Sequence, residues 1–215
     1  MNDWLAEVDG YCERLGPGYW AEPVNALTNL AFVLAALLVW PKVRSRSTGR
    51  VMAANLAVIG VGSWLFHTHA NRLTGLMDVL PILAFILIYV FAATRDFLDA
   101  RPAVALGAAA AFVPYAAATV PLWAMVPGLG SSAGYAPVPV LILGYALALC
   151  RRAPDTARGL AIGAGLLVVS LVFRTLDGPV CAVWPLGTHF LWHLTNAAML
   201  GWMIVVWQRH VDCSA

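Results

Sequence analysis

The sequence predicts an all-α membrane protein, a bundle of seven transmembrane helices. Of its 215 residues, 61% are hydrophobic and only 11% are charged, whereas a soluble domain averages about 25% charged residues. So few charges cannot cover a soluble globule, and the strand-type alternation of a membrane β-barrel is absent from the sequence. The formal net charge of +2 gives no basic surplus for neutralising phosphates, which excludes a nucleic-acid binder.

Seven apolar runs support the seven predicted spans, since a span needs about 20 apolar residues, or fewer where flanking groups snorkel. The runs cover residues 24–40, 51–68, 76–93, 103–123, 137–150, 159–176 and 187–207. They occupy most of the chain and leave no room for a soluble domain. We therefore expect an N-terminal segment 1–23, a transmembrane domain 24–207 and a tail 208–215.

The sequence indicates the boundaries of some spans more clearly than those of others. The first run begins after Glu22, because Pro23 suits the first position of a helix. Asn25, Thr28 and Asn29 in this run are interpreted as residues that form hydrogen bonds between helices. The fourth and fifth runs are the least sharply bounded, because prolines lie near their ends. These prolines are Pro114, Pro121, Pro137 and Pro139.

Basic residues predict the orientation of the bundle. Ten of the 13 Lys and Arg residues follow spans one, three, five and seven, which end on the same side. They are Lys42, Arg44, Arg46, Arg50, Arg95, Arg101, Arg151, Arg152, Arg158 and Arg209. The positive-inside rule assigns that side to the cytoplasm. We expect the N-terminus outside and the C-terminus in the cytoplasm.

Five polar residues at the predicted outer ends of three spans do not suit a bilayer. Ser63 and His67 lie four apart at the end of span two, Asp78 opens span three, and His189 and His193 lie four apart at the start of span seven. Residues four apart share one helix face. The topology therefore brings all five to one membrane depth, where ionisable groups are costly and by default functional.

Three imidazoles with an open fourth position are typical of catalytic zinc. A His pair at i and i+4 supplies two ligands, here His189 and His193, and His67 would supply the third. Zinc lowers the pKa of its bound water to about 7. Asp78 is then the candidate base for that water, and Ser63 the candidate hydrogen-bond donor to an oxyanion. We predict an integral, multi-pass membrane protein with a catalytic zinc site near the extracytoplasmic face.

Two other classes of protein remain open at this point. Membrane helices also present His ligands to haem, which would make the chain an electron carrier. A receptor-like, lipid-sensing protein could hold the same zinc as a structural ion. A single membrane His is more often a hydrogen-bonding residue, and a single Ser a packing residue.

At these residues the chain resembles the alkaline ceramidase family, within the wider group of seven-span membrane hydrolases that includes adiponectin-type receptors. The similar segments are Tyr11-Cys12-Glu13, the stretch Ala21–Leu30, Gly62–His67 followed by Asp78–Pro81, and His189–Leu194. The resemblance covers both ends of the chain and spans one, two, three and seven. It implies that the three histidines bind zinc, that Ser63 and Asp78 assist catalysis, and that the substrate is a lipid. The family hydrolyses the amide of ceramides to a fatty acid and a sphingoid base.

The resemblance also implies a calcium site at the outer entrance, for which hard oxygen ligands are suitable. Its ligands would be the carboxylates of Asp9, Glu13 and Glu22 and the carbonyl of Tyr11. Here Gly10 separates Asp9 from the aromatic residue, and Leu15 replaces an asparagine ligand. The alternative is an acidic face exposed to solvent.

The predicted topology sorts the four cysteines into two pairs. Cys12 and Cys181 lie on the outer side, and Cys150 and Cys213 on the cytoplasmic side. Disulfides form outside the cytosol, so we expect a Cys12–Cys181 bond, with Cys150 and Cys213 reduced. The related family has cysteines in similar places. The alternative is two unpaired outer thiols.

Overall fold

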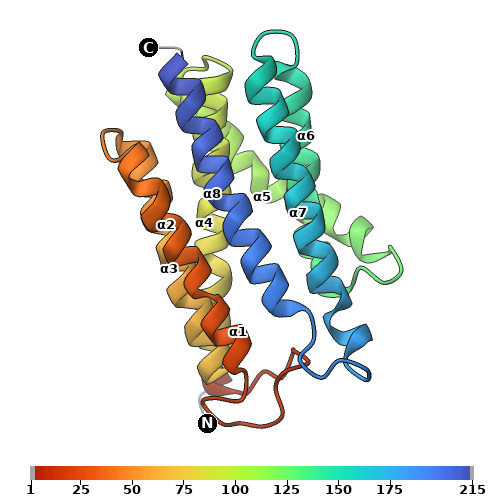
Figure 1. Ribbon diagram of the computed structural model, residues 1–215. Coiled ribbons are helices and arrows are strands. Elements are labelled where there is room, and N and C mark those ends of the chain that lie inside the picture. Colours follow the sequence, from red (N-terminus) through yellow and green to blue (C-terminus); the bar gives the residue numbers. More distant parts are fainter. Residues whose placement is uncertain (1–2, 214–215) are drawn as a thin grey trace.

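The computed structural model describes residues 3–213 and folds them into a bundle of helices, with no strand in that range (Figure 1). The α-helices are α1 (Pro23–Thr28), α2 (Leu30–Val43), α3 (Ser47–His69), α4 (Arg72–Phe97), α5 (Pro102–Ala124), α6 (Pro137–Leu149), α7 (Pro154–Val180) and α8 (His189–Cys213). Two short 3-10 helices are η1 (Asp3–Leu5), near the N-terminus, and η2 (Gly130–Gly134), before α6. The predicted all-α fold class is confirmed.

Seven stretches within residues 3–213 are long and apolar enough to cross a membrane, as predicted. Each overlaps one predicted run, and most extend several residues beyond it. The fifth differs most, because α6 has only 13 residues and would be too short to span alone. The preceding η2 completes a stretch of 20 residues, Gly130–Leu149.

The first span is interrupted at Asn29, where α1 ends and α2 begins. The Thr28 hydroxyl lies 2.8 Å from the Val24 carbonyl and 3.1 Å from the Asn25 carbonyl, and the Asn29 amide donates to Asn25 at 2.8 Å. Such side chains compete with the backbone for helix carbonyls and loosen the helix. The break lies against Gly60 of α3, where a Cβ would come within 2.9 Å of the Asn29 carbonyl.

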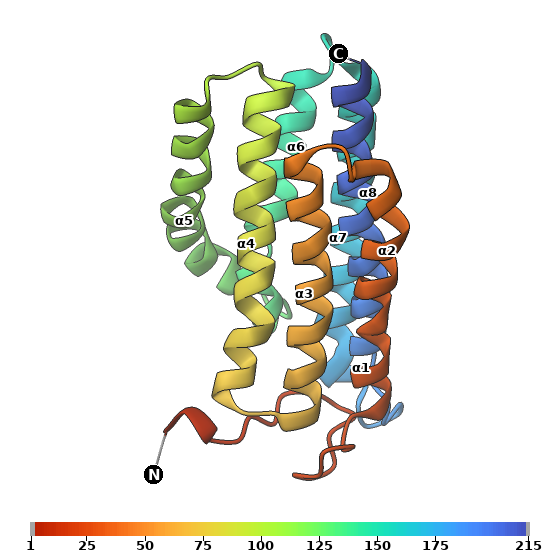
Figure 2. The ribbon, with the colours of Figure 1, turned by 90° about the vertical axis from the view of Figure 1, so that its left-hand side faces the viewer.

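Helix α8 is the innermost helix of the bundle. It contacts α2, α3, α4 and α7, and 61% of its apolar window is buried, against 17% for α5. Helix α5 lies at the periphery, beside α4 (Figure 2). Side chains near the start of α8 are therefore shielded by several helices at once.

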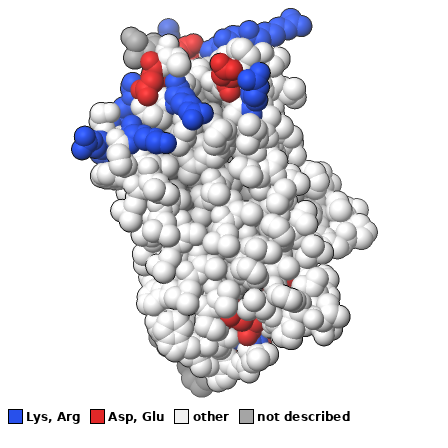
Figure 3. Space-filling view, viewed as in Figure 1, with Lys and Arg blue, Asp and Glu red and all other residues white. Residues whose placement is uncertain are grey.

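Many large apolar side chains are exposed, and on the face in Figure 3 the middle of the bundle shows almost no charge. Leu38, Leu147 and Leu106 are 75%, 73% and 65% exposed. An apolar surface of this kind is costly in water and suits contact with lipid.

The two ends of the bundle differ in charge. We call one the histidine end, where the N-terminal segment (residues 3–22), the α3–α4 turn and the α7–α8 loop meet (Figures 1 and 2). The opposite end, which contains the C-terminus and most Lys and Arg side chains, is the basic end (Figure 3). Which end faces the cytoplasm stays a prediction from the distribution of basic residues.

Candidate metal and catalytic site

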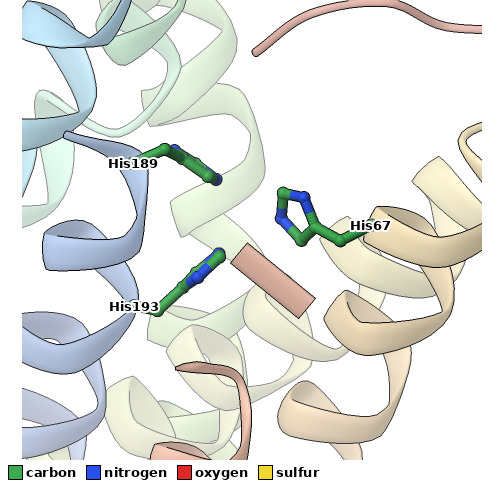
Figure 4. A group of neighbouring side chains, drawn as sticks. All are labelled: His67, His189 and His193. Carbon is green, nitrogen blue, oxygen red and sulfur yellow. The ribbon is translucent and has the colours of Figure 1, made fainter. Parts of the chain in front are cut away.

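Three histidines converge at the histidine end of the bundle (Figure 4). His67 lies in the last turn of α3, and His189 and His193 lie one turn apart at the start of α8. All three are at most 1% exposed. One nitrogen from each ring lies within 4.8 Å of the other two, which is close enough for the three to bind one metal ion.

Hydrogen bonds hold two of these rings with one nitrogen free. His67 Nδ1 lies 2.6 Å from Glu22 Oε2, and because a carboxylate only accepts, this nitrogen donates. His193 Nδ1 lies 2.9 Å from the Thr28 hydroxyl, whose own proton can go to the nearby carbonyls of α1. The Nε2 atoms of His67 and His193 are buried without a partner, as is Nδ1 of His189.

This donor set fits a zinc ion. Neutral imidazole nitrogens are its usual ligands, and a hydrogen bond on the second nitrogen is the usual way to fix their orientation. Unpartnered buried nitrogens are otherwise costly. One nitrogen of each ring would bind the ion, while Glu22 and Thr28 orient two of the rings.

Two further polar groups are buried beside the histidines. Asp78 is 7% exposed and Ser63 is 1% exposed, and the Asp78 carboxyl is close enough to His67 and Ser63 to interact with both. Asp78 Oδ1 and the Ser63 hydroxyl have no hydrogen-bond partner in the described part of the chain. Both groups therefore lie beside the histidines with hydrogen-bonding capacity left for a bound substrate.

Gly62 brings the helices of these two groups together. A Cβ on Gly62 would overlap the backbone carbonyl of Met77 in α4. Because Ser63 and Asp78 directly follow these two residues in sequence, the contact of the two backbones brings the hydroxyl and the carboxylate near each other. The absence of a side chain at residue 62 is therefore a condition for the site.

The N-terminal segment covers the histidines. The Tyr11 ring stacks on His189 with centroids 3.8 Å apart and lies 5.0 Å from the His67 ring. A disulfide joins the neighbouring Cys12 to Cys181, the pair expected to be bonded, with Cα atoms 5.4 Å apart. Tyr11 therefore contacts the site through its ring.

Asp177 connects the N-terminal segment to the start of α8. Its Oδ1 accepts the N–H groups of Thr188 at 2.8 Å and His189 at 2.9 Å, and its Oδ2 accepts the N–H of Cys12 at 3.0 Å. A carboxylate at a helix N-terminus satisfies otherwise unpaired N–H groups. The beginning of the helix that presents two histidines is thereby fixed.

The expected calcium ligands have other partners. Both Glu13 oxygens accept backbone N–H groups, from Val24 at 2.7 Å and Asn25 at 2.8 Å, so this side chain caps α1. The Glu22 carboxylate accepts hydrogen bonds from Arg14, Asn25 and His67. Asp9 is exposed.

Within residues 3–213, the three histidines form the only group of three or more His, Cys, Asp or Glu side chains that could share a metal ion. With these partners, the carboxylates of the N-terminal segment are not grouped to share a calcium ion. Burial raises the pKa of the Glu22 carboxyl, but hydrogen bonds from its three neighbours outweigh burial and hold the pKa below its ordinary value.

An apolar cavity lies between α4, α6, α7 and α8. On α8 it extends from Trp192 to Met203, about 16 Å at 1.5 Å per residue. At its end near the histidines, Trp192 stacks on His189, with ring centroids 5.2 Å apart. The Arg174 guanidinium lies over the rings of Tyr135 and Trp192, at 5.2 and 5.9 Å.

Sequence reasoning missed several of these residues. Arg174 offered a signal, a charge within a predicted span. The sequence predicts that Thr28 forms a hydrogen bond between helices, and in the structure its partner is His193 of the site. Asp177, Tyr135 and Trp192 gave no local signal, because their roles depend on contacts between distant parts of the chain.

The fold and site together define a class: multi-pass helical membrane proteins with a buried centre of three histidines close enough to bind a metal ion. Within this class, the model of the Ceramidase family matches residues 10–214, nearly the whole chain. The chain therefore belongs to the ceramidase family, which supports a ceramidase-like hydrolase and a lipid substrate. No curated protein matches the chain.

Proposed function

We propose that the protein is a zinc-dependent intramembrane hydrolase that cleaves the amide bond of a ceramide-type lipid. The observation that carries the proposal is the grouping of three buried imidazoles, with one nitrogen of each within 4.8 Å of the others, beside the unpartnered oxygens of Ser63 and Asp78. Membership of the ceramidase family supports the same conclusion. Calcium has no part in the proposal.

The proposed chemistry is hydrolysis of the amide by one water molecule. Zinc, when bound by His67, His189 and His193, would supply Lewis acidity and make a water acidic near pH 7. Asp78 accepts a proton from the attacking water as its oxygen bonds to the carbonyl carbon. Ser63 donates a hydrogen bond to the carbonyl oxygen as that oxygen becomes negative. Asp78 then gives the proton to the nitrogen as the carbon–nitrogen bond breaks, releasing a carboxylic acid and an amine.

The apolar cavity supports a lipid substrate. It begins beside Trp192, within contact of His189, and its walls are almost entirely aliphatic and aromatic. A hydrocarbon chain in the cavity would leave the amide at the cavity end near the histidines. Apolar pockets with a few polar groups at one end bind such ligands well.

The geometry favours this function over the two alternatives. A haem accepts at most two axial protein ligands, whereas here three imidazoles converge on one point, as for tetrahedral zinc. A purely structural zinc would have four protein ligands. Zinc held by three histidines would keep a position for water or substrate.

The decisive experiment measures metal content and hydrolysis in the same purified protein. Elemental analysis should find about one zinc per chain, and the protein should release fatty acid from ceramide. Stripping the metal should abolish release, and added zinc should restore it. A haem absorption band, or full hydrolysis by the metal-free protein, would refute the proposal.

A further inference from the structure

Arg14 is buried in the N-terminal segment, at the histidine end. Its side chain is 2% exposed. Its guanidinium donates hydrogen bonds to Glu22 Oε1 at 2.5 Å, the Gly16 carbonyl at 3.0 Å and the His67 carbonyl at 3.1 Å. Burying a guanidinium is costly, and pairs of this kind are poor general stabilisers. The position therefore requires a specific explanation.

Glu22 connects Arg14 to the imidazole of His67. One Glu22 oxygen accepts the Arg14 Nε–H, and the other accepts His67 Nδ1–H at 2.6 Å and the Asn25 amide at 3.1 Å. The carboxylate therefore lies between a fixed cation and a ring whose orientation it determines. Since Glu22 is 2% exposed, removal of the cation would leave a buried carboxylate without the positive charge paired with it.

Arg14 also holds the backbone of His67. The His67 carbonyl belongs to the last turn of α3, where carbonyls have no partner within the helix. The guanidinium supplies that partner from the N-terminal segment. Arg14 thus acts on His67 twice, through the carboxylate that holds its ring and through its own peptide group.

We propose that Arg14 is a positioning residue of the metal site and the permanent internal cation of the N-terminal segment. It clamps Glu22 so that His67 keeps Nδ1–H on the carboxylate and presents Nε2 toward His189 and His193. The inference rests on the proposed function, because it assumes that the three histidines bind zinc.

The same contacts make an exchangeable cation unnecessary. Glu22 and Glu13, the buried carboxylates of this region, are satisfied by Arg14, Asn25, His67 and backbone N–H groups. A guanidinium stays charged at physiological pH and presents its donors in a rigid plane. The protein should therefore be independent of calcium, in contrast to what the family resemblance suggested.

The test is the zinc affinity of Arg14→Gln, measured in detergent by competition with a chelator. Loss of a residue that supports a metal ligand typically lowers affinity about 10–100-fold, and we expect a loss in this range. The control is Arg72→Gln, which removes an exposed arginine that pairs with Asp3 at the same end. This control should keep the zinc affinity of the wild type.

Arg14→Lys separates positioning from neutralisation of charge, and remains informative if Arg14→Gln does not fold. An ammonium compensates Glu22 but cannot reproduce the fork that reaches three acceptors. We expect the melting temperature to recover most of the way while zinc affinity stays clearly below that of the wild type. Wild-type zinc affinity in Arg14→Lys would overturn the positioning role.

A calcium arm completes the experiment. Removal or addition of Ca²⁺ at constant zinc should change neither zinc affinity nor the melting temperature of the wild type. A fall in either on calcium removal would overturn the internal-cation role. If the wild type bound no zinc, the proposed function would fail. If it bound zinc and Arg14→Gln bound it equally well, only the Arg14 proposal would fail.

Discussion

The two ends of the bundle use the same residue types in opposite ways. At the histidine end, His67, Glu22 and Arg14 are buried and bonded to one another. At the basic end, charges lie on the surface in loose pairs, such as Arg152 with Asp99, whose side chains are 49% and 86% exposed. Ion pairs on the surface contribute at most about 1 kcal/mol to the free energy of unfolding. The comparison shows that burial and partners, more than residue type, distinguish a reactive group from a solvated one.

The largest difference is expected between two histidines of α8. His193→Ala should lose bound zinc and all detectable hydrolysis, because two ligands rarely hold catalytic zinc. His210→Ala, near the other end of the same helix, removes an imidazole that contacts Thr156 and Asp96 and should keep both. Elemental analysis and fatty-acid release measure the two effects. Full zinc occupancy in His193→Ala would remove it from the site.

Two aspartates of α4 give the next largest difference. Asp78→Asn should bind zinc normally yet lose about 10²–10⁴-fold in turnover, because an amide cannot accept the proton of water. Asp96→Asn changes a carboxylate that pairs with Arg95 and Trp207 at the basic end, and turnover should stay near that of the wild type. Equal turnover of the two variants would contradict the assignment of Asp78.

Two serines of α3 extend the comparison. Ser63→Ala should lower turnover about 10²–10³-fold, the usual cost of losing an oxyanion donor. Ser47→Ala removes an exposed hydroxyl at the start of the same helix and should have no effect. If turnover of Ser63→Ala fell by less than about threefold, Ser63 would be a packing residue, because loss of an oxyanion donor lowers turnover far more.

The cysteines test the same contrast in stability. Cys12→Ser removes the bond to Cys181 and should cost about 2–4 kcal/mol in the free energy of unfolding. Cys150→Ser replaces an exposed free thiol at the basic end and should be neutral. Denaturation in detergent measures both variants, and mass spectrometry of the unreduced protein checks the pairing. Free thiol at Cys12 in the wild type would refute it.

The smallest effect concerns two glycines. Gly62→Ala forces a Cβ against the α4 backbone and should destabilise the protein by about 1–3 kcal/mol. Gly107 of α5 has open space around it, and alanine there should be neutral or stabilise by up to about 1 kcal/mol. The melting temperatures of the two variants measure this difference. An unchanged melting temperature in Gly62→Ala would mean that α3 and α4 can separate without cost.

The sequence predicts the spans and the convergence of the site, and there is a physical reason for both. Apolar runs predict the helices directly. Because successive spans cross the membrane in opposite directions, their order determines which helix ends lie on the same side. His67, Asp78 and His189 could therefore be brought to one end without coordinates. The break at Asn29 was not foreseen, because it results from side-chain hydrogen bonds rather than from a proline or glycine.

What could not be predicted lies mainly in the N-terminal segment and the α7–α8 loop. Arg14, Glu22 and Asp177 bond to groups far away in sequence, and no periodicity reports such pairings. The resemblance to a family implied that the acidic residues bind calcium, and it implied no role for Arg14. Arg14 directly precedes Leu15, where the sequence differs from the family pattern. The roles of these residues depend on tertiary contacts.

The separation of the metal ligands along the chain has a consequence for biosynthesis. His67 belongs to the second of the seven spans and His189 to the last, 122 residues later (189 − 67). At about 5–20 residues per second, the ribosome needs roughly 6–24 s between them. During that time His67 lies in the bilayer without the two histidines of α8. Acquisition of the metal is therefore a late step in maturation, and a chain truncated before α8 should leave synthesis without a metal.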